Sequence, residues 1–365
     1  MEIRKLIECC EFISDGDHLP PPKSVDGVPF ITISNITNEN KISFGDTMFV
    51  PESYYSNLNE TKKAHNGDIL YSVVGSFGKP VYIDFEAQMV FQRHIAILRP
   101  KSNINGRFLY YTMLNPQFYK MVDKLAIGCS QRTVTLETLR NIKVNLPDRG
   151  VQDKIVEVLS LIDNKIDRNN KINDNLEAMT YDIYMYTFFS KKPTGKLKDI
   201  LVEAGKSLVQ VGEAKSSNGE YPFFTSGATI LKWDVPFTDG RNCFLNTGGN
   251  ADVKFYVGNA AYSTDTWCVS ANGNMSDYLY LLLFSIKTEL DKKFFQGTGL
   301  RHLQKPLLKE RPIYIPEKSE LETFNKQVMP MLNIISENTR ENQQLTTLRD
   351  WLLPMLMNGQ ATISD

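Results

Sequence analysis

The segment LSLIDNKIDRNNKINDNL (residues 159–176) decides the architecture, because its key residues recur at alternating steps of three and four. That spacing places them along one side of a long helix and is the heptad pattern of a coiled coil. Two asparagines stand in the stripe, and a buried asparagine is a costly choice whose best-attested use is to set register and partner. The stripe comprises Leu159, Ile162, Ile166, Asn169, Asn173 and Leu176.

The same stripe returns 169 residues later, with both asparagines in place. An apolar stripe at helical spacing is usually ordinary core, but the duplicated spacing favours two helices dedicated to each other. We expect them to pack as an antiparallel coiled coil. The second stripe comprises Val328, Met331, Ile335, Asn338, Asn342 and Leu345.

A repeated unit therefore underlies the chain, and repeats are interpreted before any single motif. The shift of 169 also takes Gly128 to Gly297 and Arg132 to Arg301. Upstream the repeat is looser: VPFIT (28–32) pairs with YPFFT (221–225), and FLYYTML (108–114) pairs with YLYLLLF (278–284). This pattern predicts a pseudo-symmetric molecule with a common frame and two divergent variable parts.

Four segments follow from this pattern: 1–149, 150–190, 191–317 and 318–359. Short apolar runs bounded by turn residues, such as FITISNI (30–36), GDILYSVVG (67–75) and HIAILRP (94–100), predict strands in the first. The fold class expected is α+β, with two mixed domains separated by two long helices. We expect Pro330 near the first turn of the second helix and a kink or end at Pro354.

Composition limits the possible functions. With 365 residues, 42% of them hydrophobic and 23% charged, the chain is typical of a globular protein of two or three domains. Its formal net charge of -1 means that a nucleic-acid surface would be a local patch or be shared with a partner. The five cysteines form no CxxC pair, so we expect reduced thiols and no zinc site.

Targeting and membrane signals are missing from the sequence. It shows no secretory signal peptide, and its longest apolar run (278–284) is too short to cross a bilayer. We therefore expect a cytoplasmic protein with no membrane partner.

Catalytic motifs are scarce. VGSFGKP (74–80) lacks the spacing of a phosphate loop, and NPQF (115–118) is one residue short of an amino-methyltransferase loop, so we expect Pro116 to end a helix there. Asp148, Asp163 and Lys165 have the order of a metal-dependent nuclease motif, but a charged helix face explains the last two better. We expect no catalytic, cofactor-binding or metal-binding residue in this chain.

Polar loops carry donors that suit DNA. Arginine commonly reads guanine, glutamine and asparagine read adenine, and lysine contacts phosphate. The duplicated Gly128/Arg132 and Gly297/Arg301 loops are the strongest candidates, and the QRH cluster (92–94) faces STDTW (263–267) in the other half. The predicted DNA-contacting residues are Ser72, Ser76, Lys79, Gln92, Arg93, His94, Ser130, Gln131, Arg132, Thr133, Asn250, Arg301, His302 and Gln304.

With these features the chain resembles the specificity subunit of a type I restriction-modification system over essentially its whole length. The signatures are GDILYSVVGSFGK (67–79), GCSQRTVTLETLRNIKVNLP (128–147), LSLIDNKIDRNN (159–170) and LTTLRDWLLPMLMNG (345–359). The resemblance implies two target-recognition domains, each reading one half of a bipartite site in double-stranded DNA. It also implies that the helices space these domains and dock two methyltransferase subunits.

The same resemblance implies that S-adenosylmethionine, ATP and magnesium act only in partner subunits, including the restriction subunits of the full complex. A helix of about 35 residues spans roughly 50 Å, enough to reach major grooves at least one DNA turn of about 34 Å apart. Two alternatives remain: a self-contained methyltransferase or nuclease with fused recognition domains, and a coiled-coil interaction protein unrelated to DNA.

Overall fold

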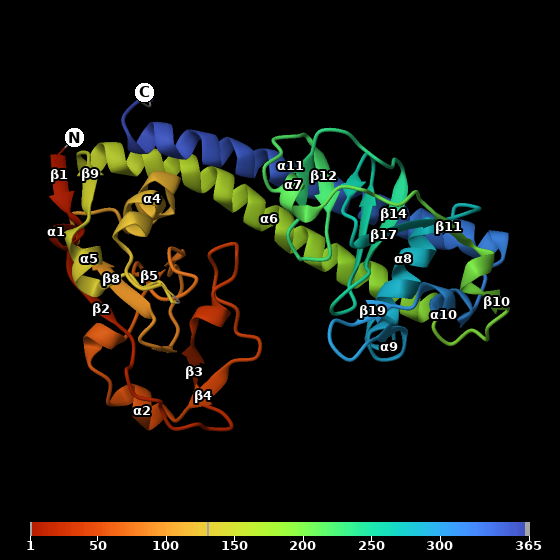
Figure 1. The fold of residues 1–365 in the computed structure, drawn as a ribbon, viewed down its shortest axis with the longest axis horizontal. Coiled ribbons are helices and arrows are strands. Elements are labelled where there is room, and N and C mark those ends of the chain that lie inside the picture. Colours follow the sequence, from red (N-terminus) through yellow and green to blue (C-terminus); the bar gives the residue numbers. More distant parts are fainter. Residues whose placement is uncertain (1, 130, 362–365) are drawn as a thin grey trace. The chain divides into compact units, whose positions relative to one another are not determined.

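The computed structural model describes residues 2–129 and 131–361, which form two compact units (Figure 1). Of the described residues, the first unit contains 2–129, 131–164 and 346–361, and the second contains 165–345. Both are mixed units of short strands and helices, as the sequence predicts. The two longest helices each contribute residues to both units.

The first unit is built around a four-stranded antiparallel sheet in the order β2-β8-β5-β6. A second sheet has the order β4-β3-β7, in which β3 and β7 are parallel. The strands are β1 (Glu2–Lys5, paired with β9), β2 (Cys10–Asp15), β3 (Val28–Ile31), β4 (Met48–Val50), β5 (Ile69–Ser72), β6 (Pro80–Tyr82), β7 (Val90–Phe91), β8 (Ile95–Pro100) and β9 (Lys143–Leu146). The helices are α1 (Leu6–Cys9), α2 (Glu52–Ser56), α3 (Gly106–Leu114), α4 (Pro116–Leu125) and α5 (Leu136–Asn141).

The second unit repeats this plan with sheets β11-β17-β14-β15 and β13-β12-β16, and again the pair β12/β16 is parallel. Its strands are β10 (Gly195–Lys196), β11 (Leu201–Glu203), β12 (Tyr221–Phe224), β13 (Leu231–Trp233), β14 (Arg241–Asn246), β15 (Val253–Val257), β16 (Ala261–Tyr262), β17 (Thr266–Ala271), β18 (Phe295–Gln296), β19 (His302–Leu303) and β20 (Pro312–Ile313). Its helices are α7 (Val211–Ala214), α8 (Ser276–Ser285), α9 (Lys287–Glu289), the π-helical η4 (Leu290–Phe294) and α10 (Lys305–Lys309).

The repeat therefore extends through the variable parts, where the sequences have diverged. Ile31 of β3 is in register with Phe91 of β7, and Phe224 of β12 is in register with Tyr262 of β16. VPFIT and YPFFT thus occupy equivalent strands, although their offset differs from 169. The FITISNI run is not one strand, because β3 ends at Ile31 and a 3-10 turn follows, closed by the Asn35 side chain on the backbone N–H of Thr32.

Each central strand is buried on both faces, which explains its continuous apolar run. Ile69 and Tyr71 of β5 pack with Phe108 of α3, whereas Leu70, between them, packs on the opposite face with Ile31. Alternate side chains of a strand point to opposite faces, so one strand serves two cores. In the second unit, β14 likewise divides its side chains between two apolar clusters.

The long helices are α6 (Arg149–Phe188) and α11 (Lys318–Met357), the yellow-green and blue helices of Figure 1. The expectation for Pro330 is wrong: α11 begins twelve residues earlier, so this proline lies inside the helix and withholds one backbone N–H from it. Pro354 lies in the last turn, three residues before the helix ends at Met357. NPQF behaves as expected, since Asn115 closes α3 and its side chain caps the next helix, α4.

The two long helices run antiparallel: contacts at higher residue numbers on α6 are made with lower residue numbers on α11. In the first unit Arg349 donates to the Asp163 carboxylate at 3.1 Å. In the second unit Asn169 donates to Asn342 at 2.9 Å, and Asn338 donates to Asn173 at 2.8 Å. The coiled coil therefore has polar contacts along part of its seam.

Candidate nucleic-acid interface

A tight loop follows Gly128 in the first half. Gly128 has φ of 95°, and a Cβ there would lie 2.6 Å from the backbone oxygen of Gln131, so a side chain is excluded. Backbone hydrogen bonds between Ile127 and Thr133, of 2.8 and 2.9 Å, close the loop. Gln131 is exposed at its tip, while Ser130 lies outside the described residues.

The second half repeats this loop after Gly297. The φ of Gly297 is 144°, and a Cβ there would lie 2.7 Å from the backbone oxygen of Leu300. Gln296 is in register with His302, as Ile127 is with Thr133 in the first half. The duplicated loops thus share one geometry, and His302 is exposed where Thr133 stands in the first copy.

Each of these loops is joined to the loop that follows the central strand. The backbone N–H of Gly75 donates to the carbonyl of Arg132 at 2.9 Å, and that of Gly249 donates to the carbonyl of Arg301 at 2.9 Å. Two loops from distant parts of the sequence therefore form one surface in each unit. Ser76 and Asn250 occupy matching positions on it and are exposed.

Ser72 does not present a donor to this surface. It is fully buried; its hydroxyl donates to the carbonyl of Ser76 at 3.0 Å and accepts from the backbone N–H of Lys79 at 3.0 Å. Its counterpart Asn246 donates to the carbonyl of Asn250 at 3.1 Å. These two side chains hold the loop through hydrogen bonds to its backbone. The buried position of Ser72 corrects the expectation that it contacts DNA.

The second donor cluster in the first half lies at the turn before β8. Arg93 is exposed, and its Nε donates to Nε2 of His94 at 3.3 Å. Burial, and then the Arg93 charge, lowers the pKa of His94 below its ordinary value. Gln92 is half-buried, and Lys79 donates to the side chain of Asn38 at 2.9 Å.

The matching turn in the second half carries a different chemistry. Gln92 and Ser263 are equivalent, since their backbone N–H groups donate to Ile31 and Phe224 respectively. Asp265 is exposed in the second half where His94 stands in the first. The correspondence between QRH and STDTW thus holds in position, while the side chains differ in charge.

Both predicted arginines make ion pairs within their own unit. Arg132 donates to the carboxylate and the backbone carbonyl of Asp123, and it lies over the Phe77 ring at 5.5 Å. Arg301 donates to the Asp291 carboxylate at 3.0 Å and to its carbonyl at 3.1 Å. The backbone N–H of Ala251, followed by Arg301, lowers the pKa of Asp291.

The remaining predicted donors of the second half surround this ion pair. Asn250 accepts from Arg301 at 2.8 Å. Gln304 donates to the carbonyl of His302 at 3.2 Å. The structure therefore brings Asn250, Arg301, His302 and Gln304 together, although the first is about fifty residues from the others.

Asp123 and Asp291 are the partners that the sequence did not indicate. They are separated by 168 residues, one fewer than the repeat, so a strict shift of 169 aligns neither with an acid. Their segments also differ: Asp123 lies in the α-helix α4 and Asp291 in the π-helical η4. A search for acids within one residue of the repeat offset would have found the pair.

A tyrosine hydroxyl ties each mixed domain to helix α6. In the first unit Tyr111 donates to Asp163 at 2.7 Å, and in the second Tyr280 donates to Glu177 at 2.6 Å. The shift of 169 also relates these tyrosines, and both are buried. Burial raises the pKa of each phenol, so each remains a hydrogen-bond donor at neutral pH.

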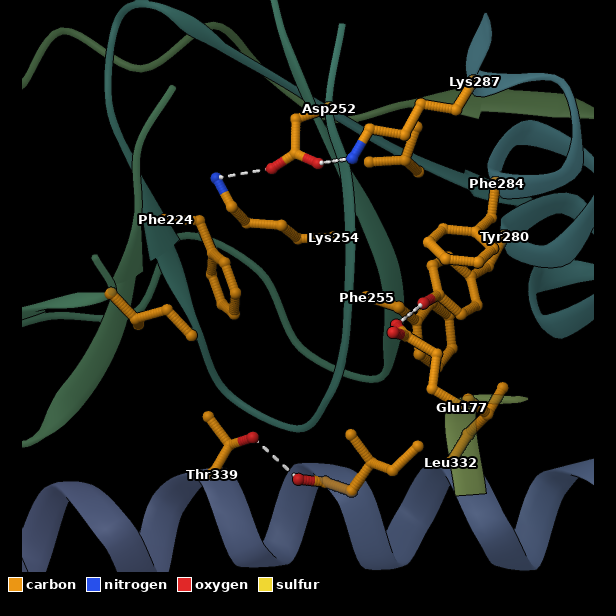
Figure 2. Close-up of a pocket in the computed structure, with 13 residues that line it drawn as sticks. Glu177, Phe224, Asp252, Lys254, Phe255, Tyr280, Phe284, Lys287, Leu332 and Thr339 are labelled. Carbon is orange, nitrogen blue, oxygen red and sulfur yellow. Dashed lines mark hydrogen bonds and ion pairs between the residues drawn. The ribbon is translucent and has the colours of Figure 1, made fainter. Parts of the chain in front are cut away.

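A pocket of about 280 Å³ lies next to the second of these contacts (Figure 2). Asp252 holds Lys287 and Lys254 at 2.7 and 3.5 Å at one end, and Tyr280 with Glu177 forms the other. Lys254 also donates to two backbone carbonyls. The polar groups at each end of the pocket are thus paired with one another, which is the chemistry of a structural contact.

The nuclease-like triplet is not assembled into a metal site. Asp163 accepts from Arg349 and Tyr111, while Lys165 pairs with Glu341 of α11 at 3.1 Å. Within residues 2–129 and 131–361, no three His, Cys, Asp or Glu side chains group as metal ligands. Over the same residues, no helix has the length and apolar character needed to span a bilayer.

Comparison with known proteins identifies the sequences that share this plan. Residues 1–178 and 190–347 each match the family model described as "Type I restriction modification DNA specificity domain". The chain is 23% identical to the type I restriction enzyme HindI specificity subunit of Haemophilus influenzae, covering 82% of this chain and 88% of that one. It is 21% identical to the MjaIX specificity subunit of Methanocaldococcus jannaschii, covering 73% and 71%.

A solved structure shares the fold. The crystal structure of a type I restriction-modification S subunit from M. genitalium matches with a TM-score of 0.60. The match covers 100% of this chain and 96% of that one at 14% sequence identity. The double domain with two long helices is therefore a fold seen before.

Proposed function

Since the chain belongs to the type I restriction modification DNA specificity family, we propose that it is the DNA-recognition subunit of a type I restriction-modification complex. In this proposal residues 1–149 and 191–317 are two target-recognition domains, and each reads one half of a bipartite site in double-stranded DNA. Residues 150–190 and 318–359 form the helices between them.

One observation carries this proposal: the same two-loop surface is built twice from different side chains. The backbone bonds from Gly75 to Arg132 and from Gly249 to Arg301 are equivalent. The loop residues differ at equivalent positions: exposed Gln131 corresponds to exposed Leu300, and Thr133 corresponds to exposed His302. A shared frame with unlike donors suits two readers of unlike half-sites, because sequence is read through base edges whereas backbone contacts only position the protein.

The contacts proposed for the first half come from the exposed and half-buried donors of its loops. Glutamine can bond adenine through two hydrogen bonds, and arginine can bond guanine in the same way. The set for the first half comprises Ser76, Lys79, Gln92, Arg93, His94, Gln131 and Thr133, and the set for the second half comprises Asn250, His302 and Gln304. Lys79 suits a phosphate oxygen better than a base edge, because its ammonium is a point charge.

Partner subunits complete the complex in this proposal. A net charge of -1 is low for a protein that binds DNA alone, so two methyltransferase subunits would supply part of the phosphate contact. S-adenosylmethionine, ATP and magnesium would act in these partners and in the restriction subunits. This chain would contribute recognition and a docking surface, with no cofactor of its own.

The helix pair would set the distance between the half-sites. A helix of 40 residues, such as α6, rises about 60 Å along its axis. The paired asparagines suit such a spacer, since buried amides favour one register over its neighbours. Spacer length would thus be a property of the helices and base identity a property of the loops.

Mapping of methylated adenines across the genome tests the proposal. Cells that carry the methyltransferase subunits with this chain should methylate one bipartite motif, and cells without this chain should not. The same methylation pattern in both strains would overturn it. A self-contained methyltransferase would instead show itself as adenine methylation of duplex DNA by the purified chain alone.

A further inference from the structure

The two arginines at matching positions of the repeat make matching contacts. Arg132 binds both the carboxylate and the backbone carbonyl of Asp123, and Arg301 binds both of these groups on Asp291. The acids lie 9 and 10 residues before their arginines. One arrangement is therefore formed twice, although the helical segments that hold the acids differ.

Each arginine also connects the three segments of its recognition surface. Its side chain binds the helical segment, its backbone lies in the loop that begins at Gly128 or Gly297, and its carbonyl accepts from the neighbouring loop. A further contact comes from that neighbouring loop in both halves, from the Phe77 ring on Arg132 and the Asn250 amide on Arg301. Loss of the guanidinium would thus release two loops from the helical segment.

The residues beside the arginines have changed between the halves, but the arginines and their acids have not. Gln131 and Thr133 of the first loop correspond to Leu300 and His302 of the second. Side chains that read bases should differ wherever the half-sites differ, whereas a side chain that supports the loop can stay the same. The pattern favours a supporting role for the arginines.

The charges of the aspartates also favour a supporting role for the arginines. A partly exposed ion pair is weak by itself, so attraction to the acid alone would not keep an arginine from DNA. However, an arginine that turned to DNA would also give up a carbonyl contact and would leave Asp123 or Asp291 unpaired beside phosphates. Two-nitrogen contacts of a guanidinium have strict geometry: Arg301 already binds both carboxylate oxygens of Asp291, and Arg132 binds one carboxylate oxygen and the carbonyl of Asp123.

We propose that Arg132 with Asp123, and Arg301 with Asp291, are matched clamps that position the recognition loops, and that neither arginine reads a base. The inference rests on the proposed function and assigns base reading in each half to the exposed neighbours of the clamp. Arg132 and Arg301 are positioning residues. This differs from the direct base contact that the sequence suggests for them.

The direction in which the aspartate variants change the preference for a half-site tests the clamp. The full complex with its methyltransferase subunits is titrated with a duplex that carries the mapped motif and with duplexes in which one half-site is scrambled. Asp123→Asn should lower the preference for the first half-site by about 5- to 30-fold, the loss expected for one such contact. Asp291→Asn should do the same for the second half-site only.

Two further variants complete the set. Arg132→Lys keeps the charge but loses the fork, so it should match Asp123→Asn, and the double variant should be no worse than either single one. Asp84→Asn, which removes the same charge from a pair with Arg107 in the first domain, is the control and should leave the preference unchanged. Thermal unfolding of each variant beside the wild-type complex shows whether the altered domain is folded.

Opposite results would overturn the clamp. If Arg132 reads a base or binds phosphate, Asp123→Asn frees it, and the preference or affinity should stay the same or rise while Arg132→Ala lowers it. An Arg132→Lys variant with normal recognition would likewise point to a simple phosphate contact. A wild-type complex that prefers no duplex would instead refute the proposed function itself.

Discussion

Asn169 of α6 donates a hydrogen bond to the side-chain oxygen of Asn342 of α11 at 2.9 Å. The shift of 169 converts this pair into Asn338 and Asn173, which are hydrogen-bonded at 2.8 Å. The coiled coil thus contains one amide contact twice, related by the internal repeat. Asn169 is only 1% exposed and also donates to Glu341, so its buried amide depends on both of these hydrogen bonds.

Replacing Asn169 tests what this amide contributes. Asn169→Ala should lower the free energy of unfolding by about 1–3 kcal/mol, because the buried Asn169 amide loses two hydrogen bonds of about 0.5–1.5 kcal/mol each, to Glu341 and Asn342. Asn169→Leu with Asn342→Leu should be nearly neutral or stabilising, while register becomes less defined. Urea denaturation measures both; Asn175→Ala, an exposed change on the same helix, is the control. Equal effects for Asn169→Ala and the control would contradict the assignment.

Lengthening both long helices tests the spacer. Inserting seven residues into α6 and seven at the facing site of α11 keeps the heptad phase and adds about 10 Å, the rise of about three base pairs. Methylation mapping should then show the same two half-sites with a longer spacer. An unchanged spacer would contradict the role of the helices, and altered half-sites would mean that the insertion disturbs the recognition domains.

The loop glycine offers a matched comparison. Gly128 and Gly67 both have φ of 95°, but only Gly128 has a backbone atom, the Gln131 oxygen, within contact of an added Cβ. Gly67→Ala should therefore report backbone strain alone, about 1 kcal/mol or more. Gly128→Ala should cost more in thermal unfolding and also abolish recognition of the first half-site. Equal behaviour of the two variants would show that the loop tolerates the displacement.

Ser72 and Ser76 separate support from contact. Ser72→Ala should cost about 1–3 kcal/mol, because the hydroxyl is buried and bonded on both sides. Ser76→Ala should change stability by less than about 0.5 kcal/mol, since its side chain is exposed. Denaturant unfolding measures both stability changes, and DNA affinity measures whether Ser76 makes a contact with DNA. A stable Ser72→Ala variant with weakened DNA binding would reverse the roles of these two serines.

His94 predicts a pH effect. Burial first, and Arg93 second, places its pKa below the ordinary 6.5. The folded state then binds this proton more weakly than the unfolded chain, so stability falls as the pH drops through 6.5 and levels off below the folded-state pKa. NMR titration, with His94→Gln to assign the signal, should give a value below 6.5. Arg93→Ala should raise it only in part, because burial is the larger cause; a value at or above 6.5 would contradict these causes.

The repeat, the helix pair and the strand content could all be predicted from local patterns. Heptad spacing around Asn169 reports a seam because side chains three and four apart share a helix face. Short apolar runs report strands because a buried strand needs apolar residues on both faces. The position expected for Pro330 is wrong because a helix held by tertiary packing accepts proline in its interior as well as in its first turn.

The sequence by itself determined that a common frame occurs twice and that polar loops interrupt it at matching places, since equal spacing is a property of the chain. Only the tertiary structure decided what the loop residues do. Arg132 meets Asp123, and Arg301 meets Asp291 and Asn250, through folding of segments whose spacing differs between the halves. Ser72 is buried for the same reason, because burial depends on what packs above a strand and not on its neighbours in sequence.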